Sequence, residues 1–109
     1  MTLNPIIEFE WYDYGRLCSY ITIHRDTGEV EVEDFTDCVL EQFLGKRPHT
    51  IEQVYEVWEE RCFDRNRVDK HELLKSLGLT QYDPYEICLQ TNGRMLHDNF
   101  EIKWIKKGI

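Results

Sequence analysis

Hydrophobic and polar side chains alternate over three short stretches near the start of the chain, at residues 6–12, 17–25 and 29–33. A period of two is typical of strands with one buried face. Short polar segments separate the stretches. The second of them contains Asp26 and Gly28, which suit a tight turn because Asp starts it and Gly accepts a positive φ. The first third of the chain is therefore predicted to be a three-stranded antiparallel meander.

The same alternation predicts one apolar and one acidic face for this meander. The apolar face is expected to carry Ile7, Phe9, Trp11, Leu17, Ser19, Ile21, Ile23, Val30 and Val32. The outer face is expected to carry Cys18 and five glutamates around a tyrosine and a histidine: Glu8, Glu10, Glu29, Glu31 and Glu33 around Tyr20 and His24. A three-stranded sheet is only marginally stable alone, so we expect helices to cover the apolar face.

The pattern becomes helical after the meander. Thr50 and Asp69 each begin a capping box, and Pro84 occupies a favoured first helical position. Glycines follow the expected helix ends, as terminators do. The sequence predicts short helices over residues 36–44, 50–62, 69–77 and 83–92.

Alternation returns near the end of the chain, over residues 99–105, where a further strand could close the sheet. Strands therefore come before helices, which is typical of α+β proteins with helices on one sheet face. The predicted fold is one α+β domain over residues 1–109, a three-stranded antiparallel meander followed by about four short helices and this closing strand.

Charge divides the chain unequally. The net charge is −8, with −10 in residues 1–60 and +2 in residues 61–109. This balance argues against direct binding of nucleic acid or anionic membranes, because phosphate contacts need clustered lysines and arginines. No apolar run approaches the length of a membrane span, and residues 1–11 lack the basic and apolar parts of a secretory signal. We expect a cytoplasmic protein.

The residues that carry chemistry are scattered. The four cysteines form no Cys-x-x-Cys pair, and without a secretory signal they are expected to be reduced. No phosphate-binding, dinucleotide-binding, zinc-protease or nucleophile-elbow motif occurs. We therefore predict no metal, no cofactor and no catalysis. A site assembled from distant residues such as Cys18, His24 and Asp98 remains an alternative.

The acidic outer face has two interpretations. It could be an ordinary solvated sheet face, whose charge also discourages aggregation between sheets. It could instead dock a basic protein, or fill a phosphate-binding groove by resembling nucleic acid.

Four arginines form the second candidate contact region. Arg61, Arg65 and Arg67 follow a predicted helix end, and Arg94 follows another. Cations at a helix end ordinarily complement its carbonyl groups. The planar guanidinium fork also suits recognition of carboxylate or phosphate groups.

The second half of the chain carries a recognisable residue pattern. It reads Trp58-x-x-Arg61-Cys62-Phe63-x-Arg65-Asn66-Arg67, then Leu73-Leu74-x-x-Leu77-Gly78-Leu79, Tyr82-Asp83-Pro84-x-Glu86-Ile87 and Gly93-Arg94-Met95-x-x-Asp98-x-Phe100. This pattern resembles a small module near the N-terminus of HipA-like kinases in Firmicutes, and short stand-alone proteins of gut bacteria and their mobile elements. The resemblance covers residues 50–105. The kinase's Gly-rich loop and catalytic and metal-binding Asp are absent, so the resemblance implies an accessory module.

These observations lead to one functional hypothesis and one alternative. The hypothesis is a non-enzymatic, protein-binding regulatory module of a bacterial toxin–antitoxin system or mobile element, with a HipA-like kinase as one candidate partner. The alternative is an acidic inhibitor that mimics nucleic acid and blocks a phage-defence or DNA-processing enzyme.

Overall fold

Four antiparallel strands form one sheet in the order β3-β2-β1-β4 in the computed structural model, which describes residues 5–107. The ends of the predicted 1–109 domain, and the start of the segment assessed for a secretory signal, lie outside the described residues. The elements follow the chain as β1 (Ile6–Asp13), β2 (Arg16–His24), β3 (Glu29–Asp34), α1 (Ile51–Glu60), α2 (Lys70–Ser76), α3 (Pro84–Thr91) and β4 (Phe100–Lys106).

The predicted α+β class and the meander are confirmed. β1, β2 and β3 pair as consecutive antiparallel neighbours, and Gly28 has the positive φ of +81° that the turn between β2 and β3 requires. The closing strand β4 returns to lie antiparallel to β1, so the strand that begins the meander becomes central in the finished sheet.

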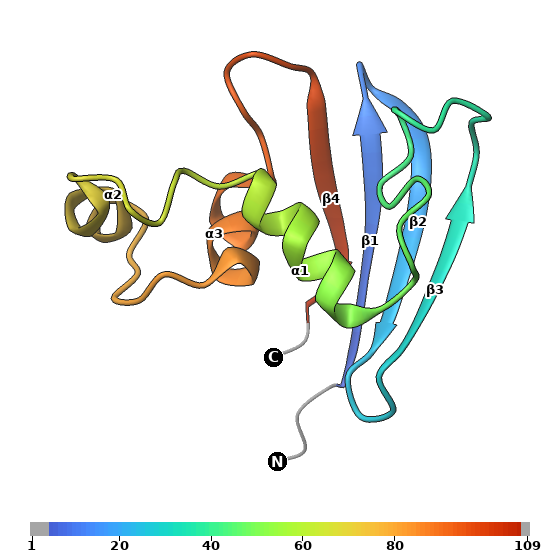
Figure 1. Cartoon of the computed structure of the whole chain (residues 1–109), viewed down its shortest axis with the longest axis horizontal. Helices are drawn as coiled ribbons and strands as arrows, with labels where there is room; N and C mark the ends of the chain where they lie inside the picture. The colour runs from blue at the N-terminus through green and yellow to red at the C-terminus, as the bar shows by residue number, and fades with distance from the viewer. Residues whose placement is uncertain (1–4, 108–109) are drawn as a thin grey trace.

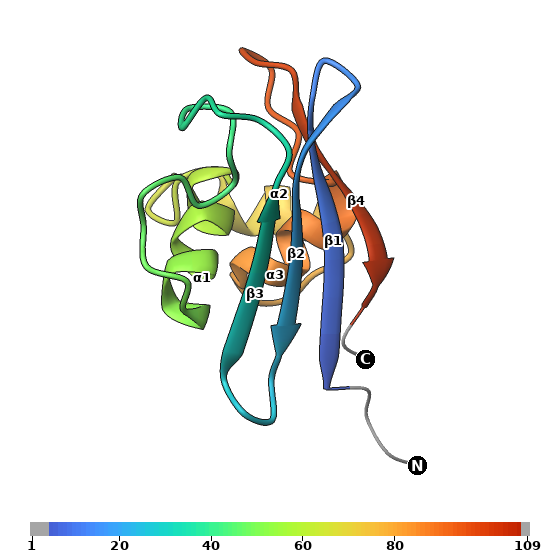
Figure 2. The same ribbon diagram turned by 90° about the vertical axis from the view of Figure 1, so that its right-hand side faces the viewer.

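The helices lie on one side of the sheet and leave its other side uncovered (Figures 1 and 2). The covered side supplies Phe9 and Ile21 to the core, both fully buried. Trp58 of α1 is also fully buried and contacts the rings of Phe9, Tyr85 and Trp104. The core is therefore a largely aromatic layer between the sheet and helices α1 and α3.

The predicted helix caps had different outcomes. Thr50 caps α1 as predicted, since its hydroxyl accepts a hydrogen bond from the Gln53 amide at 3.3 Å. Asp83 caps α3 in the same way, accepting from the Tyr85 amide at 2.9 Å. The capping box predicted at Asp69 is wrong, because its carboxylate makes no cap bond and pairs with Arg67 at 2.6 Å.

The helix predicted over 36–44 is also wrong, so the described residues form three helices rather than about four. The Thr36 hydroxyl accepts from the Cys38 amide at 3.2 Å, a local turn that competes with a helix start. The connection is instead attached to the sheet: Trp11 Nε1 donates to the Glu41 carbonyl, and the Phe43 amide donates to Ser19 Oγ. These two bonds, both 3.1 Å, hold it as an irregular segment.

A β-bulge corrects the predicted place of Cys18. Trp11 pairs with Ser19 while Tyr12 pairs with Leu17, which leaves Cys18 as an extra residue in β2. The extra residue breaks the period of two, so Cys18 and Ser19 are both fully buried although they are adjacent. From Tyr20 to His24 the alternation is as predicted. Leu17, expected on the apolar face, instead pairs with Tyr12 on the other side of the bulge and is only half-buried.

Candidate functional site

The strand register places the predicted contact residues of β1, β2 and β3 on one side of the sheet. This is the side that the helices leave uncovered, and it faces the viewer in Figure 2. We name this surface the acidic face and define it by Glu8, Glu10, Tyr20, His24, Glu29, Glu31 and Glu33. The register arranges it in cross-strand rows from β3 to β4, namely Glu33-Tyr20-Glu10-Lys103 and Glu31-Thr22-Glu8-Lys106, with Glu29 opposite His24 in a shorter row. Each glutamate of β3 therefore faces a polar or aromatic residue of β2.

The two glutamates of β1 are occupied within the sheet. Glu8 accepts a hydrogen bond from the Tyr20 hydroxyl at 2.6 Å and lies 3.6 Å from the Lys106 ammonium. That hydrogen bond, with burial and the nearby carboxylates, raises the pKa of Tyr20 to about 12. Glu10 accepts from the Tyr12 hydroxyl at 3.1 Å. The centre of the acidic face is thus partly neutralised and cross-linked.

The three glutamates of β3 carry most of the unneutralised charge. All three are exposed, and the carboxylates of Glu29 and Glu33 have no ion-pair partner among residues 5–107. Glu31 makes a 2.9 Å hydrogen bond with His24 Nε2 and remains 69% exposed. This hydrogen bond raises the pKa of His24, because the carboxylate stabilises the charged imidazole. Negative charge is therefore concentrated along β3 rather than spread evenly over the sheet.

Arg61, the first of the predicted contact arginines, is largely buried and forms internal contacts. Its Nη1 and Nη2 donate to the two carboxylate oxygens of Asp98, both at 2.7 Å, and its Nε donates to the Gly93 carbonyl at 2.8 Å. The guanidinium carbon lies 5.3 Å and 5.6 Å from the ring centroids of Trp11 and Phe100. Only 9% of the side chain is exposed, so Arg61 connects α1 to the α3–β4 connection instead of facing solvent.

The other three arginines are exposed, but each has an acidic neighbour. Arg65 pairs with Glu59 and lies 5.0 Å from the Tyr82 ring centroid. Arg67 pairs with Asp69, and Arg94 donates twice to a carboxylate oxygen of Glu101 at 2.9 and 3.1 Å. These arginines thus form separate local pairs, two on the α1–α2 connection and one on the α3–β4 connection, whereas the glutamates form one continuous surface.

The residues considered for a dispersed catalytic site are not brought together. His24 lies on the acidic face, Cys18 is buried in the bulge, and Asp98 is paired with Arg61. Burial raises the pKa of the Cys18 thiol, which disfavours the nucleophilic thiolate.

The cysteines are free thiols, and two of them share an acceptor. Cys62 and Cys88 both donate to the Trp58 carbonyl, at 3.0 and 3.5 Å. A hydrogen bond with Cys62 and burial raise the pKa of Cys88. Within residues 5–107 no group of three or more His, Cys, Asp and Glu side chains could hold a metal ion.

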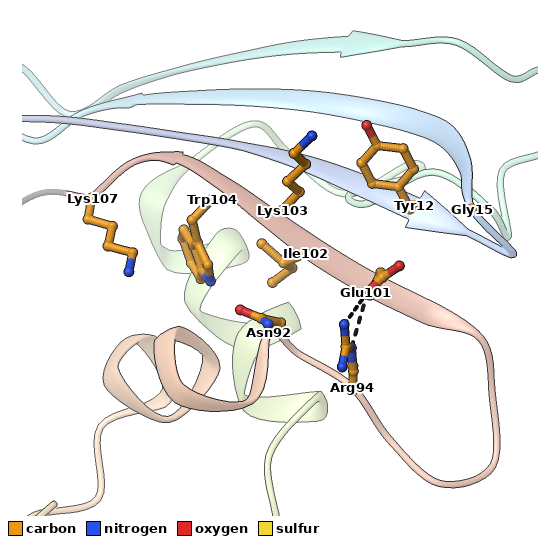
Figure 3. Close-up of a pocket in the computed structure, with 9 residues that line it drawn as sticks. All are labelled: Tyr12, Gly15, Asn92, Arg94, Glu101, Ile102, Lys103, Trp104 and Lys107. Atoms are coloured by element: carbon orange, nitrogen blue, oxygen red, sulfur yellow. Dashed lines mark hydrogen bonds and ion pairs between the residues drawn. The ribbon is translucent and has the colours of Figure 1, made fainter. Parts of the chain in front are cut away.

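A hollow of about 560 Å³ lies along β4, between the sheet edge and the end of α3 (Figure 3). Its lining consists of Tyr12, Gly15, Asn92, Arg94, Glu101, Ile102, Lys103, Trp104 and Lys107. Arg94 is joined to Glu101 across one side, and the amines of Lys103 and Lys107 point in different directions. The hollow therefore lacks a convergent set of free polar groups.

Lys103 and Lys106 are the neighbours of the acidic face that sequence reasoning missed. The alternation over 99–105 already indicated a strand, but it did not show that this strand pairs with β1. Only that pairing places Lys103 beside Glu10 and Lys106 beside Glu8.

Together, the fold and the acidic face define the class: an α+β protein with a four-stranded antiparallel sheet that is helix-covered on one side and acidic on the other. Comparison of the chain with protein-family models, with curated proteins and with solved structures finds no match. No helix within residues 5–107 is long and apolar enough to cross a membrane.

Proposed function

We propose that this chain is a non-enzymatic, protein-binding regulatory module that docks a basic partner protein on its acidic face. The observation that carries the proposal is the exposed row of Glu29, Glu31 and Glu33 on a sheet side that no helix of residues 5–107 covers (Figure 2). Complementary charge accelerates encounter and selects the partner. From the residue pattern over 50–105 we further propose that this partner belongs to a kinase-type toxin–antitoxin system or a mobile element.

Two features of the structure support binding rather than catalysis. The carboxylates of β3 are exposed to solvent on the uncovered side of the sheet. The thiols of Cys18 and Cys88 have raised pKa values and are buried. A general acid–base pair needs groups within hydrogen-bond reach of one substrate, and the candidate groups lie apart.

The test compares two variants with the same change in charge. One replaces the β3 glutamates (Glu29→Gln, Glu31→Gln, Glu33→Gln), and the control replaces exposed helix glutamates (Glu52→Gln, Glu56→Gln, Glu86→Gln). Native lysate is passed over each immobilised protein, and the captured proteins are identified by mass spectrometry.

We expect the wild type and the helix control to retain the same basic partner, and the β3 variant to lose it. The partner should also elute at about 1 M salt, where the Debye length falls to about 3 Å. Equal retention by all three proteins, or turnover of a small molecule by the isolated protein, would contradict the proposal.

Nucleic-acid mimicry remains the second candidate, supported by the same rows of glutamates. The charge density of the acidic face argues against mimicry, because it is lower than that of duplex DNA. The distance from Glu29 to Glu33 is about 13 Å at strand spacing, over which duplex DNA carries about eight charges. The acidic face has five glutamates, and Lys106 offsets one of them. Unchanged inhibition of a DNA-processing enzyme after Glu29, Glu31 and Glu33 are reversed to lysine would eliminate mimicry.

A further inference from the structure

The strand that carries the exposed glutamates is also an open edge of the sheet. Within the described residues β3 has β2 as its strand neighbour, and no strand lies beyond it (Figure 2). The opposite edge, β4, is partly closed because the Ile102 amide donates to the Asn92 carbonyl at 2.7 Å and Trp104 Nε1 donates to the Cys88 carbonyl. An open edge presents free backbone groups that can pair with another strand.

The register shows which backbone groups of β3 point to the open side. The Phe35 amide, just after β3, donates to the Cys18 carbonyl of β2 at 2.8 Å, so the Phe35 N–H points toward β2. This bond continues the register that pairs Glu33 with Tyr20. Backbone N–H direction alternates along an antiparallel strand, so the N–H groups of Glu31 and Glu33 also point to β2. The Glu29 N–H donates to Thr27 Oγ1 in the turn before the strand. The N–H and C=O groups of Val30 and Val32 therefore face outward. No hydrogen bond joins these outward groups to another residue in the part of the chain that the structure describes.

The side chains of β3 define what kind of strand would fit there. Glu29, Glu31 and Glu33 lie exposed on the outer face, while Val30 and Val32 are half-buried on the helix side. Side chains directly opposite each other on paired strands are about 5 Å apart and interact in pairs. A matching segment would therefore alternate cationic residues on the outer side with apolar residues on the inner side.

We propose that β3 binds its partner by strand addition, pairing with an extended segment that has Lys or Arg at every second position and apolar residues between them. This inference rests on the proposed function, because it specifies the chemistry of the partner at the same acidic face. A second copy of this chain paired β3 to β3 fits poorly, since the two glutamate rows would lie opposite each other and repel.

The first test uses two synthetic peptides of identical composition and charge. One alternates lysine and valine over seven residues, and the other has its lysines in one block and its valines in another. Binding is measured by titration calorimetry. Strand addition predicts that the alternating peptide binds about tenfold more tightly, because only it can match every glutamate while pairing its backbone.

The second test blocks the open edge without changing its charge. Val32→Pro removes an N–H group that the ladder with β2 does not use, and proline is tolerated on sheet edges for that reason. Val32→Ala is the control, because it removes apolar volume and keeps the N–H. We expect Val32→Pro to weaken the alternating peptide about tenfold or more, and Val32→Ala to change its affinity only about twofold.

A third measurement does not depend on how the variants fold. An alternating peptide with N-methylated valine amides keeps its charge but cannot complete a ladder, so it should bind as weakly as the block peptide. Equal affinity of all three peptides, abolished by the glutamine substitutions in β3, would overturn strand addition and leave charge-based docking intact. Binding that the glutamine substitutions do not weaken would overturn both proposals.

Discussion

The glutamates of β3 and the arginines of the second half were both expected to contact partners. In the fold the glutamates stay exposed along one strand, whereas the arginines are paired with carboxylates. Glu29, Glu31 and Glu33 share one exposed edge, and two of them have no ion-pair partner in the described residues. Arg61 is 9% exposed and bonded to Asp98, while the exposed arginines each have a nearby carboxylate. Charges on one strand face are placed together by local geometry. Charges at helix ends and on loops depend on what tertiary packing brings beside them.

The largest expected effect on stability comes from removing Arg61, the arginine that is bonded inside the molecule. Arg61→Ala leaves the Asp98 carboxylate without its bidentate partner and removes a group packed beside Trp11 and Phe100. Because 24% of the Asp98 side chain is exposed, we expect the loss in free energy of unfolding to lie at the lower end of the range for buried pairs, about 3 kcal/mol. Arg65→Ala removes only an exposed ion pair and an exposed contact with the Tyr82 ring, so it should lower the free energy of unfolding by about 1 kcal/mol. Urea unfolding of both variants makes the measurement, and similar losses would show that Arg61 has no special structural role.

The next largest effect on stability is expected at Gly28, in the turn between β2 and β3 that fixes the register of the β3 glutamates. Gly28 has a φ of +81°, which a β-branched residue adopts only with strain. Gly28→Val should therefore lower the free energy of unfolding by about 1–3 kcal/mol, whereas Gly28→Asn should cost less. A shift of one residue in register would also move the glutamates to the buried side of the sheet. Thermal unfolding compares the two variants, and equal melting temperatures would show that the turn does not constrain β3.

The stability of the protein at acid pH tests the paired charge of Asp98. The hydrogen bonds from Arg61 lower the pKa of Asp98 below its ordinary value of 3.8. A lowered pKa in the folded state means that the pair stabilises the protein fully above pH 3.8 and loses its effect as the pH falls through the lowered value. We expect the melting temperature of the wild type to fall more steeply in this acid range than that of Asp98→Asn. Parallel curves for the two proteins would refute this linkage.

The smallest effect on stability belongs to the β3 glutamates. Replacing Glu29, Glu31 and Glu33 with glutamine removes exposed charges that make few internal contacts, so the free energy of unfolding should change by about 0.5 kcal/mol or less. Chemical denaturation checks this expectation. A large loss would show that the acidic face is part of the folding energetics and would weaken its assignment as a binding surface.

The sequence by itself determined the elements whose signals are local. Alternation predicted β1 to β3 and the faces on which Glu31 and Ile21 lie, and Thr50 and Pro84 marked real helix starts. These predictions succeed because a strand's period of two and a helix cap depend on neighbours a few residues away. The helix expected at 36–44 failed because a local turn at Thr36 and hydrogen bonds to distant Trp11 and Ser19 decided that segment.

Tertiary structure alone decided which charges remain available. The pairing of β4 with β1 brings lysines to the far side of the sheet, and the contact between Arg61 and Asp98 joins residues 37 positions apart. The bulge at Cys18 likewise depends on how two strands match, because one inserted residue changes which face its neighbours occupy. Charge and hydrophobicity are properties of single residues, so they can be read along the chain. Exposure and ion pairing are relations between distant residues, and the fold has to form before they exist.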